Sequence, residues 1–133
     1  MGADERFYPG TSRITEIESF HRYHAAASLC ADRSVLDAAS GEGYGSNILA
    51  GKAACVTGLD LCEEAVKNAN KKYGSEKLSY VHGSALEMPF ADKSFDRVVS
   101  FETIEHLPDH RKFLSEIRRV LKDDGILDRK SVV

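Results

Sequence analysis

The stretch that decides the fold is Arg33-Ser-Val-Leu-Asp-Ala-Ala-Ser-Gly-Glu-Gly-Tyr-Gly45. A short apolar run ends in Asp37, a loop of small residues follows, and the pattern becomes helical over residues 44–51. A doubly wound α/β domain uses strand, glycine-rich turn and helix in this order to bring its backbone close to a nucleotide-like ligand. Glycine permits positive φ in such a turn and leaves no Cβ in the way of the ligand. We therefore expect Asp37 at the carboxyl end of the first strand, beside the ligand.

The glycine spacing and the acid indicate what kind of ligand the loop accepts. The dinucleotide fingerprint Gly-x-Gly-x-x-Gly places glycine at its sixth position, where this chain has Ser46, and the third glycine comes early, at Gly45. The phosphate-binding loop that ends in Gly-Lys-Ser/Thr is also missing from the sequence. A carboxylate at the loop entrance repels an anionic pyrophosphate and attracts a free amino group. Asp37 therefore favours a ligand that carries positive charge.

The rest of the chain alternates between strand and helix patterns. Strands are predicted at about 34–38, 54–60, 77–82 and 95–100, and helices at about 13–30, 44–51, 62–73 and 109–122. This rhythm predicts βαβ units, a parallel sheet and helices on both of its faces. The apolar face of the first helix is expected to include Phe20 and Ala27. Asp109 is the expected N-cap of the last helix, and Gly125 its stop, with a fifth strand beginning at Gly125.

Length and composition set broad limits. The chain has 133 residues, enough for one domain with a single core, and its formal charge of −3 offers no broad patch for nucleic acid. No stretch approaches the roughly 18 apolar residues that span a membrane, and the N-terminus has no signal-peptide pattern. The three cysteines, Cys30, Cys55 and Cys62, lack metal-binding spacing and predict reduced thiols in a cytoplasmic protein. We expect Cys55 to pack within the second strand.

The segment Val35-Leu-Asp-Ala-Ala-Ser-Gly-Glu-Gly43 resembles the first motif of the class I methyltransferases that use S-adenosylmethionine. Their usual pattern is apolar-Leu-Asp-x-Gly-x-Gly-x-Gly, and Ala39 replaces its first glycine. Residues 56–60, 81–90, 94–107 and 113–125 resemble later motifs of the same family, so the likeness runs from about 35 to 127. The resemblance implies an α/β, Rossmann-like, doubly wound and mostly parallel sheet flanked by helices. It also implies a single domain over 1–133, with an N-terminal lid helix in 1–31 and the core in 34–127.

The resemblance further implies where S-adenosyl-L-methionine, and its product S-adenosyl-L-homocysteine, would bind. Asp37 would lie near the amino group of the cofactor, and Asp60 would accept hydrogen bonds from both ribose hydroxyls, a role that can coexist with capping the next helix. Ser84 stands where many relatives have an aspartate that binds the adenine amino group. The cofactor-binding residues are thus predicted to be Asp37, Ala39, Ser40, Gly41, Gly43, Asp60, Leu61, Ser84, Ala85, Leu86 and Phe101. Leu61 would lie against the adenine, and Phe101 would supply a backbone carbonyl.

Two residues after the fourth strand are candidates for catalysis. His106 has an ordinary pKa suited to a general base, and Glu102 is placed to contact the substrate. The alternative for His106 is packing under the rim of the sheet. In the N-terminal region, Tyr8 and Tyr23 are candidates for contact with cofactor or substrate. His21 and His24 have helical spacing but no evident third ligand, so no metal site is predicted.

The acceptor of the methyl group is predicted by analogy and by missing motifs. The Asn/Asp-Pro-Pro-aromatic motif of base-nitrogen methylation does not follow the fourth strand, and Glu102 and Glu105 are too close together for arginine methylation. The remaining motifs resemble bacterial methyltransferases that act on small molecules, sugars or lipid-linked glycans. We therefore expect a small-molecule or glycan substrate and no nucleic acid. The alternatives are a catalytically silent cofactor-binding remnant and a nicotinamide-dependent domain, the latter disfavoured by Ser46 and Asp37.

The end of the sequence departs from the family pattern. In this family the fifth strand lies inside a seven-stranded sheet and further strands follow, whereas here the charged residues 128–130 follow Leu127 and the chain ends at Val133. A buried parallel strand is normally a continuous apolar run, so three consecutive charges there are costly unless that stretch is exposed. We therefore expect a C-terminally truncated domain that lacks the last strands. An unprotected sheet edge templates pairing, which predicts a homodimer, with exchange of an element between chains as one route.

Overall fold

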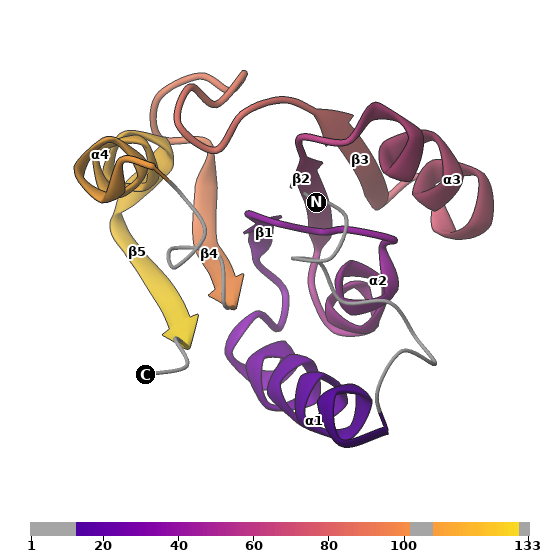
Figure 1. Cartoon of the computed structure of the whole chain (residues 1–133). Coiled ribbons are helices and arrows are strands. Elements are labelled where there is room, and N and C mark those ends of the chain that lie inside the picture. Colours follow the sequence, from indigo (N-terminus) through magenta and orange to yellow (C-terminus); the bar gives the residue numbers. More distant parts are fainter. Residues whose placement is uncertain (1–12, 102–107, 131–133) are drawn as a thin grey trace.

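The computed structural model describes the backbone of residues 13–101 and 108–130 and the side chains of residues 20–101 and 108–128. Five strands form one parallel sheet in the order β3-β2-β1-β4-β5 (Figure 1). The elements in chain order are α1 (Arg13–Leu29), β1 (Ser34–Asp37), α2 (Tyr44–Ala50), β2 (Cys55–Asp60), α3 (Glu63–Tyr73), β3 (Leu78–His82), β4 (Phe95–Phe101), α4 (His110–Val120) and β5 (Leu121–Lys130). The predicted α/β class is confirmed, and the first four strands lie within a residue or so of their expected bounds.

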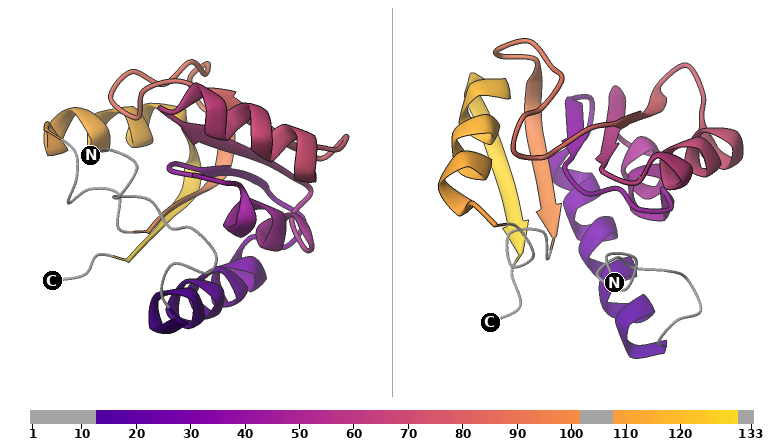
Figure 2. Two further views of the ribbon diagram at one scale, coloured as in Figure 1. Left: turned by 45° about the vertical axis from the view of Figure 1, so that its right-hand side comes forward. Right: turned by 45° about the horizontal axis from the view of Figure 1, so that its top comes forward.

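Helices cover both faces of the sheet, as expected. Successive β1 side chains point to opposite faces, so Val35 packs with residues of α1, α2 and α3, whereas Leu36 packs with residues of α4. Figure 2 shows the same division, with α4 on one side of the sheet and the first three helices on the other. Both faces of the central strands are therefore buried, which explains their continuous apolar runs.

The strand order places the switch point of the fold beside β1. From β1 the chain crosses through α2 to β2 on one side, whereas β4 pairs with the other side of β1 and leads to α4 on the opposite face. Ligands of open α/β sheets bind in the crevice outside the carboxyl ends of the strands at such a point. Asp37 and Phe101 end the two strands that meet there.

The prediction for the last helix and fifth strand was wrong in its boundaries. The helix ends at Val120, because Leu121 already has an extended backbone (φ −78°, ψ 140°) while its N–H still donates to Ile117. The register then shifts, and Gly125 lies inside β5 instead of acting as a helix stop. A Cβ at Gly125 would come 2.7 Å from Leu121 Cδ2 and 3.2 Å from the Asp96 carbonyl oxygen. Glycine at this position suits the close packing at the irregularity and does not terminate the helix.

The charged residues 128–130 lie in the fifth strand, where they were expected to be costly unless that stretch is exposed. They continue β5 and pair with residues 99–101 of β4. β5 is the outer strand of the described sheet, where Ile126 keeps 41 % of its surface exposed. An edge strand tolerates charge that a central strand would not.

Of the expectations for single residues, some are confirmed and others are wrong. Asp109 is the N-cap of α4, with its side chain accepting a hydrogen bond from the Lys112 N–H at 3.0 Å. Cys55 was expected to pack within β2 but is exposed at the start of the strand. Phe20 was expected on the buried apolar face of α1 but is exposed, with its ring against His24 at 4.1 Å between centroids, whereas Ala27 on the same helix is buried as expected. No helix in the described part of the chain has the length and apolar character needed to cross a bilayer.

Candidate functional site

The loop after β1 is joined to both neighbouring strands by its own backbone. The Ala38 N–H donates to the Val99 carbonyl oxygen at 2.9 Å, and the Ser40 N–H donates to the Leu59 carbonyl oxygen at 3.0 Å. Gly41 and Gly43 have φ values of +54° and +93°, which residues with a Cβ rarely adopt. The sequence therefore builds a fixed, glycine-lined turn at the carboxyl edge of the sheet.

Tyr80 of β3 holds this loop through its hydroxyl group. Tyr80 was not identified from the sequence as part of the site. Its hydroxyl donates to the Gly43 carbonyl oxygen at 2.7 Å, and burial raises the pKa of Tyr80, which keeps it protonated as a donor. The Asn70 side chain bonds the Tyr80 N–H and carbonyl, each at 2.9 Å. A Cβ at Gly43 would lie 2.8 Å from both the Tyr80 hydroxyl oxygen and Ala69 Cβ. Gly43 is thus required by packing as well as by its backbone conformation.

Asp37 is a buried carboxylate whose hydrogen-bond donors in the described structure are neutral. Ser46 Oγ donates to it at 2.7 Å and the Tyr23 hydroxyl at 3.4 Å, and only 1 % of Asp37 is exposed. Burial raises its pKa to about 6, although hydrogen bonds from Ser46, Tyr23 and the Ala39 N–H act in the opposite direction. No ion pair of Asp37 is found within the described residues, so a cationic group of a ligand would relieve the cost of this buried charge.

Asp60 is held differently, by backbone N–H groups. Its Oδ2 accepts from Gly41 at 2.8 Å and its Oδ1 accepts from Cys62 at 2.9 Å. Cys62 is the N-cap residue of α3, so Asp60 links the glycine loop to the start of that helix. These bonds fix the orientation of the carboxylate at the edge of the sheet. The next residue, Leu61, is 72 % exposed and presents apolar surface at the same edge.

The turn that contains Ser84, Ala85 and Leu86 begins beside Asp60. The Gly83 N–H donates to the Asp60 carbonyl oxygen at 3.0 Å. Ser84 Oγ accepts from the Leu86 N–H at 3.0 Å, so this hydroxyl shapes the turn. Ala85 and Leu86 pack against the apolar cluster on the α4 face. The predicted adenine-binding residues are therefore next to the predicted ribose-binding residue.

On the opposite side of the site, α1 docks through Tyr23. A Cβ at Gly45 would fall 2.1 Å from the Tyr23 ring, and the Tyr23 and Phe101 rings meet edge to face with centroids 5.0 Å apart. Gly45 thus provides the space that the ring occupies. Tyr8, Glu102 and His106 lie outside the described residues.

Two buried carboxylates, Asp37 and Asp60, flank the glycine loop, and Ser40 and Ser100 have buried hydroxyl oxygens that find no partner within the described structure. Such acceptors suit a ligand that carries an amino group and a hydroxylated sugar. Ser46 is the second residue that sequence reasoning missed: its departure from the dinucleotide fingerprint was noticed, but its bond to Asp37 was not. The described residues contain no cluster of three side chains suited to a metal ion.

Comparison with known proteins gives a consistent result. Residues 36–127 match the methyltransferase domain family. A probable S-adenosylmethionine-dependent methyltransferase of Mycolicibacterium smegmatis is 42% identical over 124 residues, which is 92% of this chain and 48% of that protein. The phthiotriol/phenolphthiotriol dimycocerosates methyltransferase of Mycobacterium tuberculosis is 35% identical over 111 residues, or 82% of this chain and 41% of that protein. The chain thus spans less than half the length of these relatives.

A solved structure adds a neighbour with a bound ligand. Phosphoethanolamine N-methyltransferase 1 of Haemonchus contortus, in complex with phosphoethanolamine and S-adenosylhomocysteine, superimposes with a TM-score of 0.71 at 26% identity. The match covers 85% of this chain and 26% of that one. The similarity therefore extends from sequence motifs to the arrangement of the sheet and helices.

Proposed function

Because this chain belongs to the methyltransferase domain family, whose members use S-adenosylmethionine, we propose that it forms the cofactor-binding part of a methyltransferase. The proposed site lies at the carboxyl ends of β1 and β2. The acceptor is a small molecule, a sugar or a lipid-linked compound. The observation that carries the proposal is Asp37, a buried carboxylate with neutral hydrogen-bond donors at the switch point of the sheet.

Each residue in the proposed site has one binding task. Asp37 pairs with the amino group of the cofactor, and the backbone of residues 39–43 follows its methionine part. Asp60, oriented by two backbone N–H groups, accepts from the ribose hydroxyls. Leu61 covers one face of the adenine, and residues 84–86 meet its edge. Phe101 contributes its backbone carbonyl.

The chemistry proposed for this site is an in-line displacement. The cofactor, when bound, supplies a methyl group already activated by the positive sulfur. What remains for the protein is to align donor and acceptor and to exclude water, which is catalysis by positioning. An acceptor oxygen or nitrogen also has to lose a proton as its bond to the methyl carbon forms. We propose Glu102 and His106 for contact with the acceptor and for removal of that proton.

The acceptor class draws support from one relative and from charge. The relative at 35% identity is named for methylation of phthiotriol and phenolphthiotriol dimycocerosates, which are lipids. The net charge of −3 argues against a nucleic-acid substrate. We favour an apolar or lipid-linked acceptor on these grounds. Activity in the cytoplasm is part of the same proposal, and the three free thiols are compatible with it.

Self-association is a further part of the proposal. β5 is the outer strand of the described sheet, and its Ile126 is exposed, so pairing of two such edges would cover both. Light scattering at increasing protein concentration tests this idea. A mass of two chains is expected, and one chain at every concentration would contradict it.

Calorimetric titration tests the proposed function. S-adenosylhomocysteine and S-adenosylmethionine should bind with micromolar affinity, roughly −8 kcal/mol, whereas NAD should not bind. Binding of NAD alone would overturn the proposal. Incubation with candidate lipid and sugar acceptors then separates turnover from the silent alternative, because a silent protein would bind both S-adenosyl ligands and form no methylated product.

A further inference from the structure

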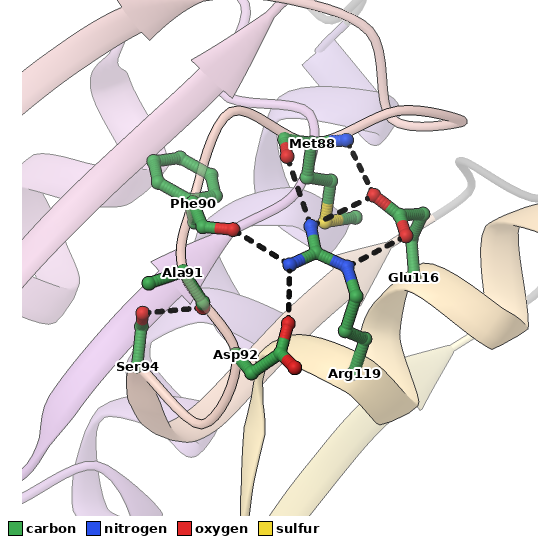
Figure 3. A network of polar contacts seen from close by, with 7 residues as sticks. All are labelled: Met88, Phe90, Ala91, Asp92, Ser94, Glu116 and Arg119. Atoms are coloured by element: carbon green, nitrogen blue, oxygen red, sulfur yellow. Dashed lines mark hydrogen bonds and ion pairs between the residues drawn. The ribbon is translucent and has the colours of Figure 1, made fainter.

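The segment between β3 and β4 crosses the α4 side of the molecule without a helix of its own. It begins at Gly83, carries the proposed adenine contacts at residues 84–86, and ends where β4 starts at Phe95. Such a long connection has few backbone bonds to hold it, so its shape depends on side chains from elsewhere. Figure 3 shows that one side chain of α4, Arg119, makes several hydrogen bonds to this segment.

Arg119 bonds to the segment at three points. Its Nη2 donates to the Met88 carbonyl oxygen at 2.9 Å, and its Nη1 donates to the Phe90 carbonyl oxygen at 2.7 Å and to Asp92 Oδ1 at 2.9 Å. The same guanidinium is fixed from behind by Glu116, with Nε–Oε2 and Nη2–Oε1 distances of 2.8 and 3.0 Å. Glu116 Oε1 in turn accepts from the Met88 N–H at 2.6 Å. We call these five residues the Arg119 clamp.

The clamp has the properties of a rigid fixture. A guanidinium is planar and presents its donors at fixed angles, so it can hold two carbonyls at a set separation, which a lysine cannot. Glu116 and Arg119 are three residues apart and share one face of α4. The hydrogen bond from Arg119 lowers the pKa of Glu116, which keeps the pair ionised. The helix itself is anchored by buried Phe113, Ile117 and Val120.

A packing path leads from the clamp to the proposed adenine end of the site. Pro89 lies between the two clamped carbonyls and packs on Gly83, where an added Cβ would be 3.1 Å from its Cγ and Cδ atoms. A Cβ at Gly83 would also be 3.2 Å from Leu59 Cδ1, so Gly83 is enclosed on two sides. Gly83 donates to the Asp60 carbonyl oxygen and directly precedes Ser84. A shift of the clamped carbonyls would therefore move the turn at 84–86.

We propose that Arg119 is a positioning residue for the adenosine end of the cofactor, acting through Pro89 and Gly83 without touching the ligand. This inference rests on the proposed function, since it takes residues 84–86 as the adenine contacts. A purely structural role would make the clamp contribute to stability alone. A positioning role makes it contribute to affinity for any ligand that carries adenosine.

The test compares two ligands and a graded set of variants. S-adenosylhomocysteine carries both the adenosine and the amino-acid end, whereas 5′-methylthioadenosine carries only the former. Arg119→Lys keeps the positive charge but loses the planar set of donors, and it should weaken the binding of both ligands by the same factor, roughly tenfold. Glu116→Gln keeps the shape of the side chain and should reduce both affinities by a smaller common factor. It replaces Arg119→Lys in the test if that variant does not fold. Asp37→Asn should weaken S-adenosylhomocysteine alone.

A matched control removes an ion pair outside the clamp. Lys93→Gln breaks the surface pair of Lys93, a residue of the same segment, with Asp123. This variant should bind the two ligands as the wild type does. Clamp variants that are folded, lose melting temperature and keep both affinities would overturn the inference and leave the proposed function intact. Failure of the wild type to bind either ligand would overturn the proposed function and, with it, this inference.

Discussion

Asp37 and Asp60 end neighbouring parallel strands, and both are buried, yet the fold holds them differently. Asp60 accepts from two backbone N–H groups, which cannot rotate away. Asp37 accepts from the side-chain hydroxyls of Ser46 and Tyr23 as well as from the Ala39 N–H, and burial raises its pKa to about 6. Two carboxylates at equivalent strand ends can therefore differ in their hydrogen-bond donors and in their suitability for a charged partner. Asp60 is a carboxylate oriented by backbone donors, whereas Asp37 is a buried carboxylate without an ion pair among the described residues, which supports the pairing with an amino group proposed above.

The largest expected effect comes from Asp60→Ala. This change removes the proposed ribose acceptor and leaves the Gly41 and Cys62 N–H groups without their carboxylate partner. We expect a loss of S-adenosylhomocysteine affinity of about 2–3 kcal/mol, or roughly a hundredfold, and a stability loss of about 1–3 kcal/mol. Calorimetry and thermal melting measure the two losses separately. An unchanged affinity in a folded variant would contradict the ribose assignment.

Asp37→Asn sharpens the comparison because its two effects should have opposite signs. The variant removes a buried charge, so the protein without ligand should gain roughly 1–2 kcal/mol of stability at pH 7. It also removes the partner of the amino group, so affinity for S-adenosylhomocysteine should fall roughly tenfold or more. Urea unfolding and calorimetry provide the two values. Asp60→Asn is the matched control, because it should lose both stability and affinity.

The pH dependence should also distinguish the two acids. The folded pKa of Asp37 is about 6, above its ordinary value of 3.8, so the folded state holds this proton more tightly than the unfolded chain. Its contribution to stability is therefore most favourable below about pH 4, is lost as the pH rises to about 6, and is constant above that. Affinity for a cationic amino group should change the other way, falling below pH 6 by up to about tenfold per pH unit.

Binding measured between pH 5 and 8 tests this expectation. The slope below pH 6 should vanish in Asp37→Asn and persist in Asp60→Asn. Asp96 and Glu116 have lowered pKa values, held down chiefly by a bond from the Ser34 N–H and by the Arg119 side chain respectively, so they titrate below this range. A flat profile in the wild-type protein would show that Asp37 does not pair with the ligand.

The smallest effect is expected from Tyr23→Phe. The hydroxyl lies 3.4 Å from Asp37 Oδ1, which is a long hydrogen bond, and the ring stays in place over Gly45. We expect a loss of affinity of roughly twofold to fivefold, about 0.5–1 kcal/mol, and a further rise in the pKa of Asp37. Ser46→Ala removes the shorter 2.7 Å bond and should have the larger effect of the two. The reverse ranking would reassign the main support of Asp37 to Tyr23.

Much of the fold could be predicted because it depends on local pattern. Apolar runs and glycine turns placed the first four strands, and the acid at the end of β1 was placed at the correct edge of the sheet. Tyr80 and Arg119 could not be found in this way, since their partners are 37 and about 30 residues distant along the chain. The charges in β5 show a related limit. Whether a strand tolerates charge depends on its place in the sheet, which its own residues do not reveal.

The central claim is that Asp37 binds the amino-acid end of the cofactor and Asp60 its ribose. The most direct measurement is calorimetric titration of S-adenosylhomocysteine and 5′-methylthioadenosine into the wild type, Asp37→Asn and Asp60→Ala. We predict that Asp60→Ala weakens both ligands and that Asp37→Asn weakens only S-adenosylhomocysteine. Equal losses for both ligands in Asp37→Asn, or wild-type affinity in Asp60→Ala, would contradict the account.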